Sequence, residues 1–380
     1  MAQQAEASVN ALFASMGIEV NGRKPWDVQV HDGRFYARVL SMGSLGFGES
    51  YMDGWWDCEA LDELVTRLFR GDIRSQLRTN LPLIRDALRA RLMNRQAGAR
   101  AYRIAQAHYD IGNDLYQAML DQRMTYTCGY WSPSAKAPGD GPMTLDEAQE
   151  AKLDLVCRKI GLKAGQKVLD IGCGWGSFAK FAAEKYGAEV FGITVSREQV
   201  KLGRELCRGL PITVELMDYR DLNGSFDHVV SLGMIEHVGD KNYRTYFEVA
   251  RRCLKDDGLF LLHTIGGDRS VHSTDPWVNK YIFPDSMLPS AAQLTRAFEG
   301  LFVMEDWHNF AMDYDRTLMA WHRNVEEHWE TLKDRYDERF RRMWRFYLLA
   351  SAGTFRARCN QLWQIVLSPH GVPGGYQSLR

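Results

Sequence analysis

The sequence predicts an α/β protein in which a mixed seven-stranded sheet follows a smaller α+β domain. Apolar runs of strand length alternate with helical patterns from Lys167 onward, which is typical of a largely parallel sheet covered by helices. The length of 380 residues exceeds what one small core usually organises. We therefore expect two domains with a boundary near residue 100: an N-terminal α+β domain and basic connector over 1–100, and the α/β domain over 101–380.

The composition is that of a soluble globular protein, with 45% hydrophobic and 25% charged residues. The net charge of -1 predicts no nucleic-acid partner. We find no apolar run that could span a bilayer and no signal-peptide pattern. The seven cysteines occur singly, without metal-ligand spacing, so we expect reduced thiols, a cytoplasmic location and no metal site.

The N-terminal elements follow from short periodic patterns. Apolar residues at helical spacing predict helices over 9–16 and 61–68. Alternating residues over 26–30 and 35–39, separated by Asp32-Gly33, predict a β-hairpin. The glycine- and aromatic-rich stretch 42–56 shows no clear period and is expected to be irregular.

An arginine-rich segment follows over 73–104, where a leucine stripe accompanies eight arginines and only two aspartates, Asp72 and Asp86, lie alongside them. The arginines are Arg74, Arg78, Arg85, Arg89, Arg91, Arg95, Arg100 and Arg103. Such a segment can bind anionic lipid headgroups, or it can be a solvated connector that packs by its leucines. Both interpretations stay open, and Pro82 indicates a helix start or kink.

The α/β domain is predicted from seven strand patterns and the helices between them. The strands are expected over 168–171, 189–194, 212–217, 228–232, 259–264, 302–307 and 362–367, and the helices over 145–160, 178–185, 195–207, 242–254, 318–329 and 336–355. The stretch 269–289 is expected to be an irregular insertion whose Trp277, Tyr281 and Phe283 offer apolar contact at a cleft mouth.

Ligands of open α/β sheets bind at the carboxyl ends of the strands. That rule points to Gly172–Gly176, Thr194–Gln199, Asp218–Arg220, Glu236 and His263.

The stretch VLDIGCGWG (168–176) is a strand that ends in a glycine-rich turn before a helix. Its G-x-G-x-G spacing departs from the dinucleotide fingerprint and lacks the lysine of a phosphate-binding loop. Asp170, just before the turn, is similar in placement to the first motif of S-adenosylmethionine-dependent methyltransferases. The alternative is an ordinary strand-to-helix turn.

A set of motifs along the chain resembles the cyclopropane-fatty-acyl-phospholipid synthase family, which is related to the mycolic acid cyclopropane synthases. They are HYDIGNDLY (108–116), MTYTCGYW (124–131), VLDIGCGWG (168–176), GITVSREQ (192–199), MDYRDL (217–222), GMIEHVG (233–239), LLHTIG (261–266), PWVNKYIFP (276–284), MEDWHNF (304–310) and DYDRTLMAW (313–321). The resemblance covers at least 100–368, and GFGESYMDGWW (46–56) is similar to the family's first domain.

The resemblance implies that 101–380 is the catalytic domain of an S-adenosylmethionine-dependent methyltransferase with a Rossmann-like fold and helical lipid-site insertions. Its reaction would add a methylene to the cis double bond of an unsaturated phospholipid acyl chain at the membrane surface. An alkene is a weak nucleophile, so it needs an aligned electrophile away from water, and the resulting cation needs a base. The resemblance also implies a homodimer at the inner face of the cell membrane.

The resemblance further implies a bicarbonate ion as the base. The residues around it would be Cys128, Glu236, His263, Ile265 and Tyr314, with Ile265 acting through its backbone. Cys128 and His263 each have the alternative of being ordinary core residues. Glu236 is harder to explain as core, because an unpaired buried carboxylate is costly.

For the cofactor, the resemblance implies close backbone contact at two glycines, a turn organised by an aspartate, and polar or aromatic contacts from four other segments. The positions are Tyr126, Thr127, Asp170, Gly172, Gly174, Thr194, Gln199, Asp218 and Tyr219. Tyr126 and Thr127 would close over the methionine part, Thr194 and Gln199 would flank the ribose and methionine side, and Asp218 and Tyr219 would lie beside adenine. Two rivals remain: a fatty-acyl methyltransferase that forms no ring, and a catalytically silent lipid-binding protein.

Overall fold

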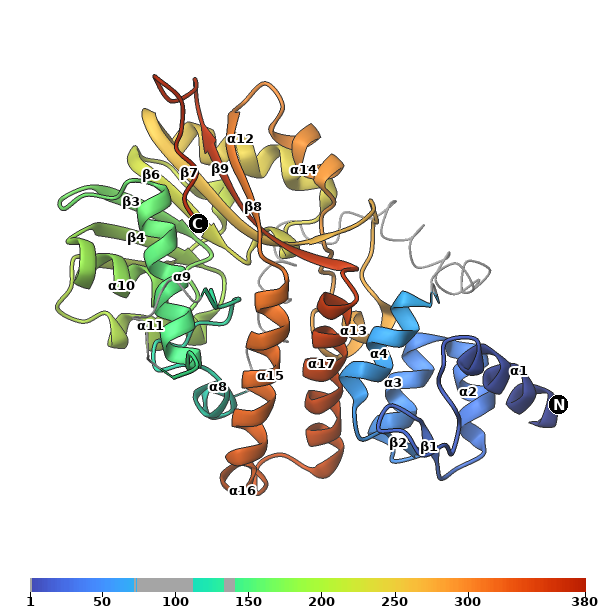
Figure 1. Ribbon diagram of the computed structural model, residues 1–380. Helices are drawn as coiled ribbons and strands as arrows, with labels where there is room; N and C mark the ends of the chain where they lie inside the picture. The colour runs from blue at the N-terminus through green and yellow to red at the C-terminus, as the bar shows by residue number, and fades with distance from the viewer. Residues whose placement is uncertain (1, 72, 74–111, 133–140) are drawn as a thin grey trace. The chain divides into compact units, whose positions relative to one another are not determined.

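The computed structural model describes residues 2–71, 73, 112–132 and 141–380 (Figure 1). The chain divides into two compact units, each assembled from separate stretches. The sheet unit takes the described residues of Asn94–His272 together with Asp285–Asp313 and Gln361–Arg380. The helical unit takes those of Met1–Met93 together with Ser273–Pro284 and Tyr314–Asn360. The expected boundary near residue 100, and the arginine-rich segment except Ile73, lie outside the described residues.

The sheet unit confirms the predicted fold class. Its seven strands lie in the order β5-β4-β3-β6-β7-β9-β8. They are β3 (Lys167–Ile171), β4 (Glu189–Thr194), β5 (Ile212–Leu216), β6 (Phe226–Leu232), β7 (Leu254–Gly267), β8 (Val303–Asn309) and β9 (Asn360–Ser368). Strands β3 to β7 pair in parallel, whereas β8 and β9 pair antiparallel, so the sheet is mixed.

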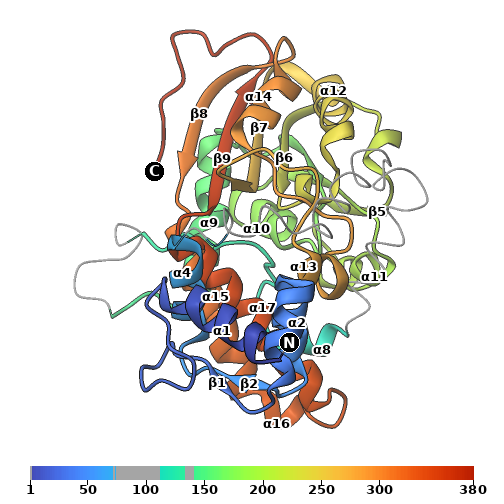
Figure 2. The same cartoon turned by 90° about the vertical axis from the view of Figure 1, so that its right-hand side faces the viewer.

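Helices cover both faces of this sheet. They are α8 (Asn113–Met119), α9 (Leu145–Lys159), α10 (Ser177–Tyr186), α11 (Arg197–Leu206), α12 (Tyr243–Cys253) and α14 (Ala291–Phe298). Helices α9 and α10 pack on one face, and α12 and α14 pack on the other (Figures 1 and 2).

The alternation of side chains along the strands decides which residues meet which helices. Leu169 and Ile171 belong to the core under α12, whereas Val168 belongs to the core under α9. Asp170 therefore lies on the α9 face of β3. By the same alternation His263 shares the face of Leu261, which is also in the core under α9.

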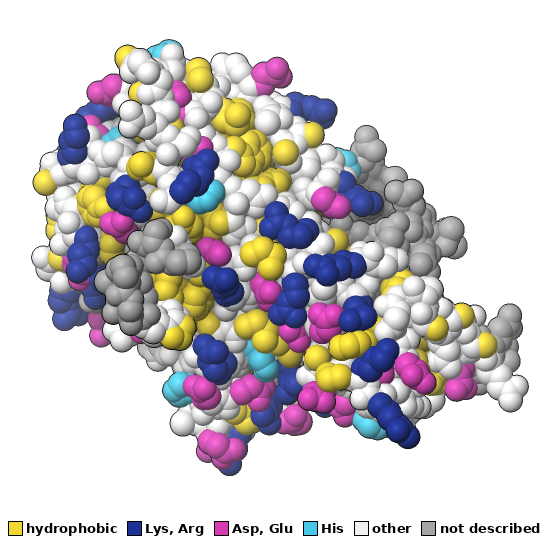
Figure 3. All heavy atoms as spheres, viewed as in Figure 1, with side chains coloured by type: hydrophobic (Ala, Val, Ile, Leu, Met, Phe, Trp, Pro, Cys, Tyr) yellow, Lys and Arg dark blue, Asp and Glu magenta, His cyan; other side chains and the backbone are white. Residues whose placement is uncertain are grey.

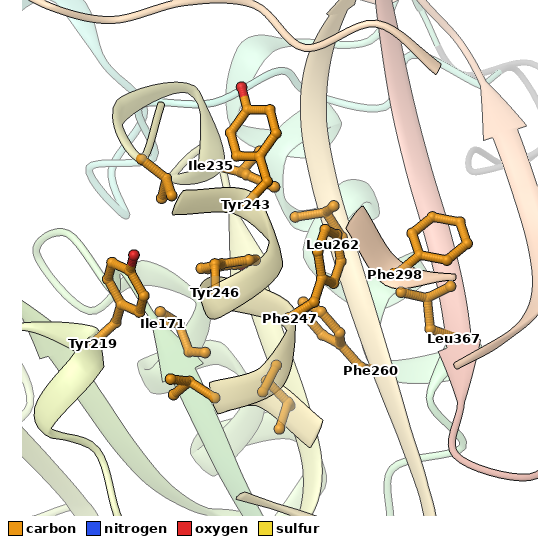
Figure 4. Close-up of a cluster of buried hydrophobic side chains, with 14 of the residues drawn as sticks. Ile171, Tyr219, Ile235, Tyr243, Tyr246, Phe247, Phe260, Leu262, Phe298 and Leu367 are labelled. Atoms are coloured by element: carbon orange, nitrogen blue, oxygen red, sulfur yellow. The ribbon is translucent and has the colours of Figure 1, made fainter. Parts of the chain in front are cut away.

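The core under α12 is largely aromatic (Figure 4). The ring centroid of Phe247 lies 6.1 Å from that of Phe260 on β7 and 5.5 Å from that of Phe298 on α14. Each such fully buried side chain contributes on the order of 2 kcal/mol. Ile235 is part of this cluster, so the packing anchors the short helical turn Ile235–His237 that carries Glu236.

The helical unit combines N-terminal helices and a small sheet with later segments of the chain. It contains α1 (Ala2–Ala14), α2 (Arg34–Met42), α3 (Ser44–Met52), α4 (Leu61–Arg70), α13 (Pro276–Tyr281), most of α15 (Met312–Glu327), α16 (Trp329–Leu332) and α17 (Glu338–Arg356), with a two-stranded sheet of β1 (Gln29–Val30) and β2 (Trp56–Asp57).

The predicted β-hairpin over 26–39 is wrong. Strand β1 pairs with β2, and the stretch expected to be the second strand forms α2. Phe35 and Tyr36 are both buried although they are adjacent, which an alternating strand does not allow when one of its faces is exposed. Together with Val39 they follow a helical spacing that the short alternating pattern concealed.

Two stretches that were expected to be irregular contain packed helices. Residues 44–52 form α3, and the insertion 269–289 contains α13. A Cβ atom on Gly48 would lie 2.4 Å from the Trp277 ring, so this glycine permits the close contact of α3 with α13. Trp277 is 2% exposed, and the expectation that it offers apolar contact at a cleft mouth is wrong.

Charged side chains of both signs are interspersed on the face drawn in Figure 3. Within the described part of the chain, none of the helices combines the length and apolar character that crossing a bilayer requires.

Candidate active site

The glycine turn after β3 has the conformation that its sequence predicts. Gly172, Gly174 and Gly176 have φ values of 88°, 57° and 85°, a region that glycine enters without steric cost. A Cβ atom on Gly172 would lie 2.7 Å from the Met234 side chain, whereas one on Gly174 would have no neighbour within 4 Å. Gly172 is therefore required by packing, and Gly174 leaves open space where a ligand can approach the backbone.

The two polar and aromatic motifs that precede β3 pack against this turn. The indole N–H of Trp175 donates to Oδ1 of Asn113 over 3.2 Å, and the Trp175 ring lies 5.0 Å from that of Tyr116. Tyr116 in turn lies 5.2 Å from Tyr126 in an edge-on arrangement. The aromatic contacts thus link Tyr126, an expected cofactor residue, to the glycine turn. Residues 108–111 of the first motif lie outside the described part.

Two buried polar side chains of α9 hold Thr127. Nε2 of Gln149 donates to the Thr127 carbonyl oxygen over 2.7 Å, and Nζ of Lys152 donates to the Thr127 hydroxyl oxygen over 2.7 Å. Both side chains are completely buried. Sequence reasoning missed them, although two polar residues three positions apart beside the apolar stripe of a helix were a usable signal.

Asp170 and Lys152 form a buried acid and base on neighbouring elements. Burial raises the pKa of Asp170 to about 7, and the charge of Lys152 opposes this shift. Burial lowers the pKa of Lys152 to about 8, opposed by the charges of Asp121, Cys128 and Asp170. Oδ2 of Asp170 has no hydrogen-bond partner among the described residues.

The end of β4 supplies a bonded pair of polar side chains. The Thr194 hydroxyl donates to Oε1 of Gln199 over 2.7 Å, and both residues are buried. Ser196 caps α11 by accepting from the backbone N–H of Gln199 over 3.3 Å. The Thr194 oxygen and the Gln199 amide are thus held at the strand end. The ribose and methionine side of a cofactor is expected at this position.

The two residues expected beside adenine follow the end of β5. Asp218 accepts from Nε and Nη2 of Arg220 over 2.8 Å and 2.6 Å, so its carboxylate is already paired. Tyr219 packs in the aromatic core 5.6 Å from Tyr246, and burial raises its pKa to about 12. The Tyr219 side chain is thus part of the core, and its place beside adenine stays a prediction.

Glu236 is fixed through one carboxylate oxygen. Oε1 accepts from the backbone N–H of Ile265 over 2.8 Å, while Oε2 has no partner in the described part of the chain. Glu236 is 5% exposed, and burial raises the pKa of its carboxyl group to about 7. The expected backbone role of Ile265 thus includes holding Glu236.

His263 is buried with one ring nitrogen engaged. Nε2 of Gln364 lies 3.4 Å from Nδ1 of His263, and an amide donor there assigns the proton of the neutral ring to Nε2. Burial keeps the pKa of His263 well below its usual value, so the ring is neutral. Its Nε2 has no partner among the residues described. The site therefore contains a buried free donor at His263 and a buried free acceptor at Glu236.

The remaining expected catalytic residues lie in two places. Cys128 is fully buried in the sheet unit, with Sγ 3.1 Å from the carbonyl oxygen of Gly129. Tyr314 belongs to the helical unit, where its ring lies 4.6 Å from that of Phe355 and 6.0 Å from that of Trp321. The structure thus brings Glu236 and Ile265 together in the sheet unit, with His263 on the same strand as Ile265.

Comparison with known proteins gives consistent matches. Residues 96–365 match the family model of mycolic acid cyclopropane synthetase. The cyclopropane-fatty-acyl-phospholipid synthase of Escherichia coli strain K12 is 50% identical over 374 residues, which cover 98% of this chain and 95% of the relative. The solved cyclopropane synthase MmaA2 of Mycobacterium tuberculosis is 30% identical, with a TM-score of 0.63 over 70% of this chain and 97% of that one. A mycolic acid cyclopropane synthase, CmaA1, solved with SAH and CTAB, gives the same values.

Proposed function

This chain belongs to the mycolic acid cyclopropane synthetase family, and we propose that it is a cyclopropane-fatty-acyl-phospholipid synthase. It would transfer a methylene group from S-adenosylmethionine to the cis double bond of an unsaturated phospholipid acyl chain. The observation that carries the proposal is the extent of the similarity. The match to the Escherichia coli phospholipid enzyme covers 98% of this chain, whereas the matches to the two solved cyclopropane synthases cover 70% of it.

The sheet unit supports S-adenosylmethionine as the cofactor. Its open space at Gly174 and the free buried oxygen of Asp170 fit a ligand that approaches the glycine turn and carries a positively charged group. When bound, this cofactor supplies an electrophilic methyl group. The residues that would hold it are Tyr126, Thr127, Asp170, Gly172, Gly174, Thr194, Gln199, Asp218 and Tyr219, the last through its backbone.

The rest of the reaction needs alignment, exclusion of water and stabilisation of a cation. An alkene attacks weakly, so its double bond must be held against the electrophile in a dry site. Aromatic faces stabilise positive charge. Phe310 lies 5.9 Å from the His263 ring and 5.4 Å from the Tyr130 ring, which places aromatic side chains beside the expected base site.

We infer that bicarbonate is the base. A bicarbonate ion has a hydroxyl donor and oxygen acceptors, which match the free acceptor Oε2 of Glu236 and the free donor Nε2 of His263. Within the sheet unit the ion would be held by Cys128, Glu236, His263 and Ile265, and would supply the group that takes the proton lost as the ring closes. The role of Tyr314 stays a prediction from the family resemblance.

Membrane docking and assembly belong to the same proposal. We infer that the enzyme works in the cytoplasm, bound peripherally to the inner face of the membrane that contains its phospholipid substrate, and that it is a homodimer. None of the described cysteines forms a disulfide, which agrees with a reducing compartment. The arginine-rich segment 73–104 is the candidate for attraction to anionic headgroups.

Lipid analysis tests the function. We expect expression in a bacterial host that lacks such an enzyme to convert unsaturated phospholipid chains into products heavier by one CH₂ group. Proton magnetic resonance of the cyclopropane ring separates this product from a methyl or methylene branch, which the ring-free methyltransferase would give. A silent lipid-binding protein would leave the lipids unchanged and would bind no S-adenosylmethionine by calorimetry.

A further inference from the structure

Lys152 is a buried cation on α9 for which neither the fold nor the proposed reaction gives a reason. Its side chain is fully buried, and Nζ donates to the Thr127 hydroxyl oxygen over 2.7 Å. An ammonium group loses much hydration free energy on burial, and one hydrogen bond to a neutral hydroxyl does not offset that loss. A balancing negative charge is therefore required nearby.

Holding Thr127 does not by itself require a charge. Gln149, one turn earlier on α9, already binds the Thr127 carbonyl oxygen with a neutral amide. Two carboxylates lie close enough to act on Lys152, namely Asp121 and Asp170. Asp121 has the larger effect on Lys152, and its oxygens also accept from the backbone N–H groups of Thr125 over 2.7 Å and Arg123 over 3.0 Å, which favours its charged form.

Asp170 is the second of these carboxylates, and it belongs to the glycine motif. It is 1% exposed, its Oδ2 has no partner in the described protein, and strand alternation places it on the α9 face of β3. It also stands two positions before Gly172, the first glycine of the turn. Lys152 thus bonds Thr127 and acts electrostatically on Asp170, two parts of the expected cofactor site that are more than forty positions apart in the sequence.

We propose that Lys152 is a positioning residue that ties the Tyr126–Thr127 segment to the glycine motif, through its hydrogen bond to Thr127 and its charge opposite Asp170. This inference rests on the proposed function only for the identity of the ligand, S-adenosylmethionine. Lys152 holds in place the segment expected to close over the methionine part, so the cofactor meets an ordered site rather than ordering it on binding.

The first test compares Lys152→Met with Lys159→Met. Lys159 is equally buried on the same helix, but its Nζ lies 3.1 Å from Nδ1 of His308 and 3.6 Å from Asp306. In the cofactor-free protein, hydrogen exchange of residues 125–128 should quicken in Lys152→Met and stay at the parent rate in Lys159→Met. Calorimetric Kd for S-adenosylmethionine should rise at least about tenfold in Lys152→Met, as the loss of a charge-assisted hydrogen bond predicts.

Variants at Thr127 separate positioning from general stability. Thr127→Val removes the hydroxyl and should reproduce both the faster exchange and the higher Kd. Adding it to Lys152→Met should change little more, because each substitution removes the same Lys152–Thr127 hydrogen bond. Thr127→Ser keeps the hydroxyl and should stay closer to the parent in both measurements. If Lys152→Met fails to fold, Lys152→Met with Asp170→Asn removes both charges and should restore a folded protein in which exchange of 125–128 is still fast.

In Lys152→Met, hydrogen exchange could instead quicken along the whole of α9, and by no larger a factor at residues 125–128. That result would overturn the proposal. So would an unchanged Kd in a folded variant. Failure of the parent to bind S-adenosylmethionine would instead reject the proposed function, and the exchange comparison would still report whether Lys152 holds the segment.

Discussion

The backbone N–H of Ile265 donates a 2.8 Å hydrogen bond to Oε1 of Glu236, which fixes a buried carboxylate through one of its two oxygens. The other oxygen, Oε2, has no partner among the described residues. Ile265 follows His263 by two positions on β7, so one strand end contributes both the histidine and the group that orients the glutamate. A ligand that donates to Glu236 would complete this arrangement.

Glu236→Gln tests the role of that charge. The glutamine keeps an oxygen that can accept from Ile265, but it removes the negative charge and one acceptor. We expect kcat to fall by about 100-fold or more, as for loss of an acid–base arrangement, with Kd for S-adenosylmethionine changed little. Glu248→Gln is the control, since Glu248 is half-exposed and pairs with Arg244 on the surface of α12. Equal kcat values for Glu236→Gln and the parent would reject the role.

The same substitution should stabilise the protein at high pH. Burial raises the pKa of Glu236 from 4.5 to about 7, so the folded state binds this proton more tightly than the unfolded chain. Its contribution to the free energy of unfolding therefore falls as pH rises from about 4.5 to about 7, by on the order of 3 kcal/mol.

Urea unfolding of the parent and of Glu236→Gln at pH 5 and pH 8 measures this effect. The difference in stability between the two proteins should shift in favour of the variant at pH 8. Subtracting the two curves removes the parallel contribution of Asp170, whose pKa is also raised. A difference that is independent of pH would show that the carboxylate is not perturbed as its burial implies.

The sheet and its ligand-binding edge were predictable because they depend on local patterns. The apolar runs of β3, β4 and β6 and the turn glycines identify both from the order of residues alone. The partners of the site residues were not predictable in this way. Lys152 acts on the charge of Asp170, and Gln364 lies beside His263, only because of which helix face and which strand neighbour the fold brings together.

The composition of the helical unit was unpredictable for a related reason. Its core depends on contacts between segments more than two hundred positions apart, such as the Trp277 ring against Gly48. No periodicity in either segment contains that information. The stretch that forms α2 was predicted as a strand because its three apolar residues fit a strand and a helix about equally well. Packing in the folded unit favours the helix.

Arg356 should contribute more to the free energy of unfolding than an exposed arginine that also binds a carboxylate with two nitrogens. It donates to both oxygens of Asp315 over 2.9 Å and to Asp62 over 2.6 Å, all within the helical unit. Arg356→Lys cannot reproduce this forked contact, and we expect a loss of about 1–3 kcal/mol in urea unfolding.

Arg34→Lys is the matched control for that change. Arg34 also binds a carboxylate, Asp32, with two nitrogens, but its side chain is 72% exposed. Because solvent screens this exposed pair, its replacement should leave the free energy of unfolding nearly unchanged. If both lysine variants lose the same amount, burial of the Arg356 contacts contributes nothing.

Membrane docking can be tested on the arginine-rich segment, which lies outside the described residues. Changing Arg78, Arg85 and Arg89 to Glu should weaken co-sedimentation with anionic vesicles, because each basic residue near such a surface contributes about 1 kcal/mol. The effect should be larger at low salt, where screening is weaker.

Changing the exposed Arg158, Lys167 and Lys333 to Glu alters the net charge by the same amount and serves as the control for docking. Equal sedimentation of the two triple variants at low salt would assign the segment a connector role. Affinity for S-adenosylmethionine should be unaffected in either protein.

Gly174 offers the sharpest test of the cofactor site. Its φ is 57°, and a Cβ atom there would meet nothing within 4 Å, so Gly174→Ala should fold at a cost of about 1 kcal/mol for the left-handed backbone. Gly161 has a φ of 62° and equally open surroundings but precedes β3, away from the turn. Gly161→Ala should therefore lose the same stability in thermal unfolding.

The two alanine variants should differ in binding alone. If the open space beside Gly174 admits the cofactor, its new methyl group occupies that space, and Kd for S-adenosylmethionine should rise by about tenfold or more, in line with the cost of overpacking a tight contact. Gly161→Ala should bind as the parent does. Gly172 does not serve this purpose, because a side chain there would collide with Met234 at 2.7 Å and disturb the fold itself. Normal calorimetric binding by a folded Gly174→Ala variant would mean that the cofactor does not approach the backbone at this glycine.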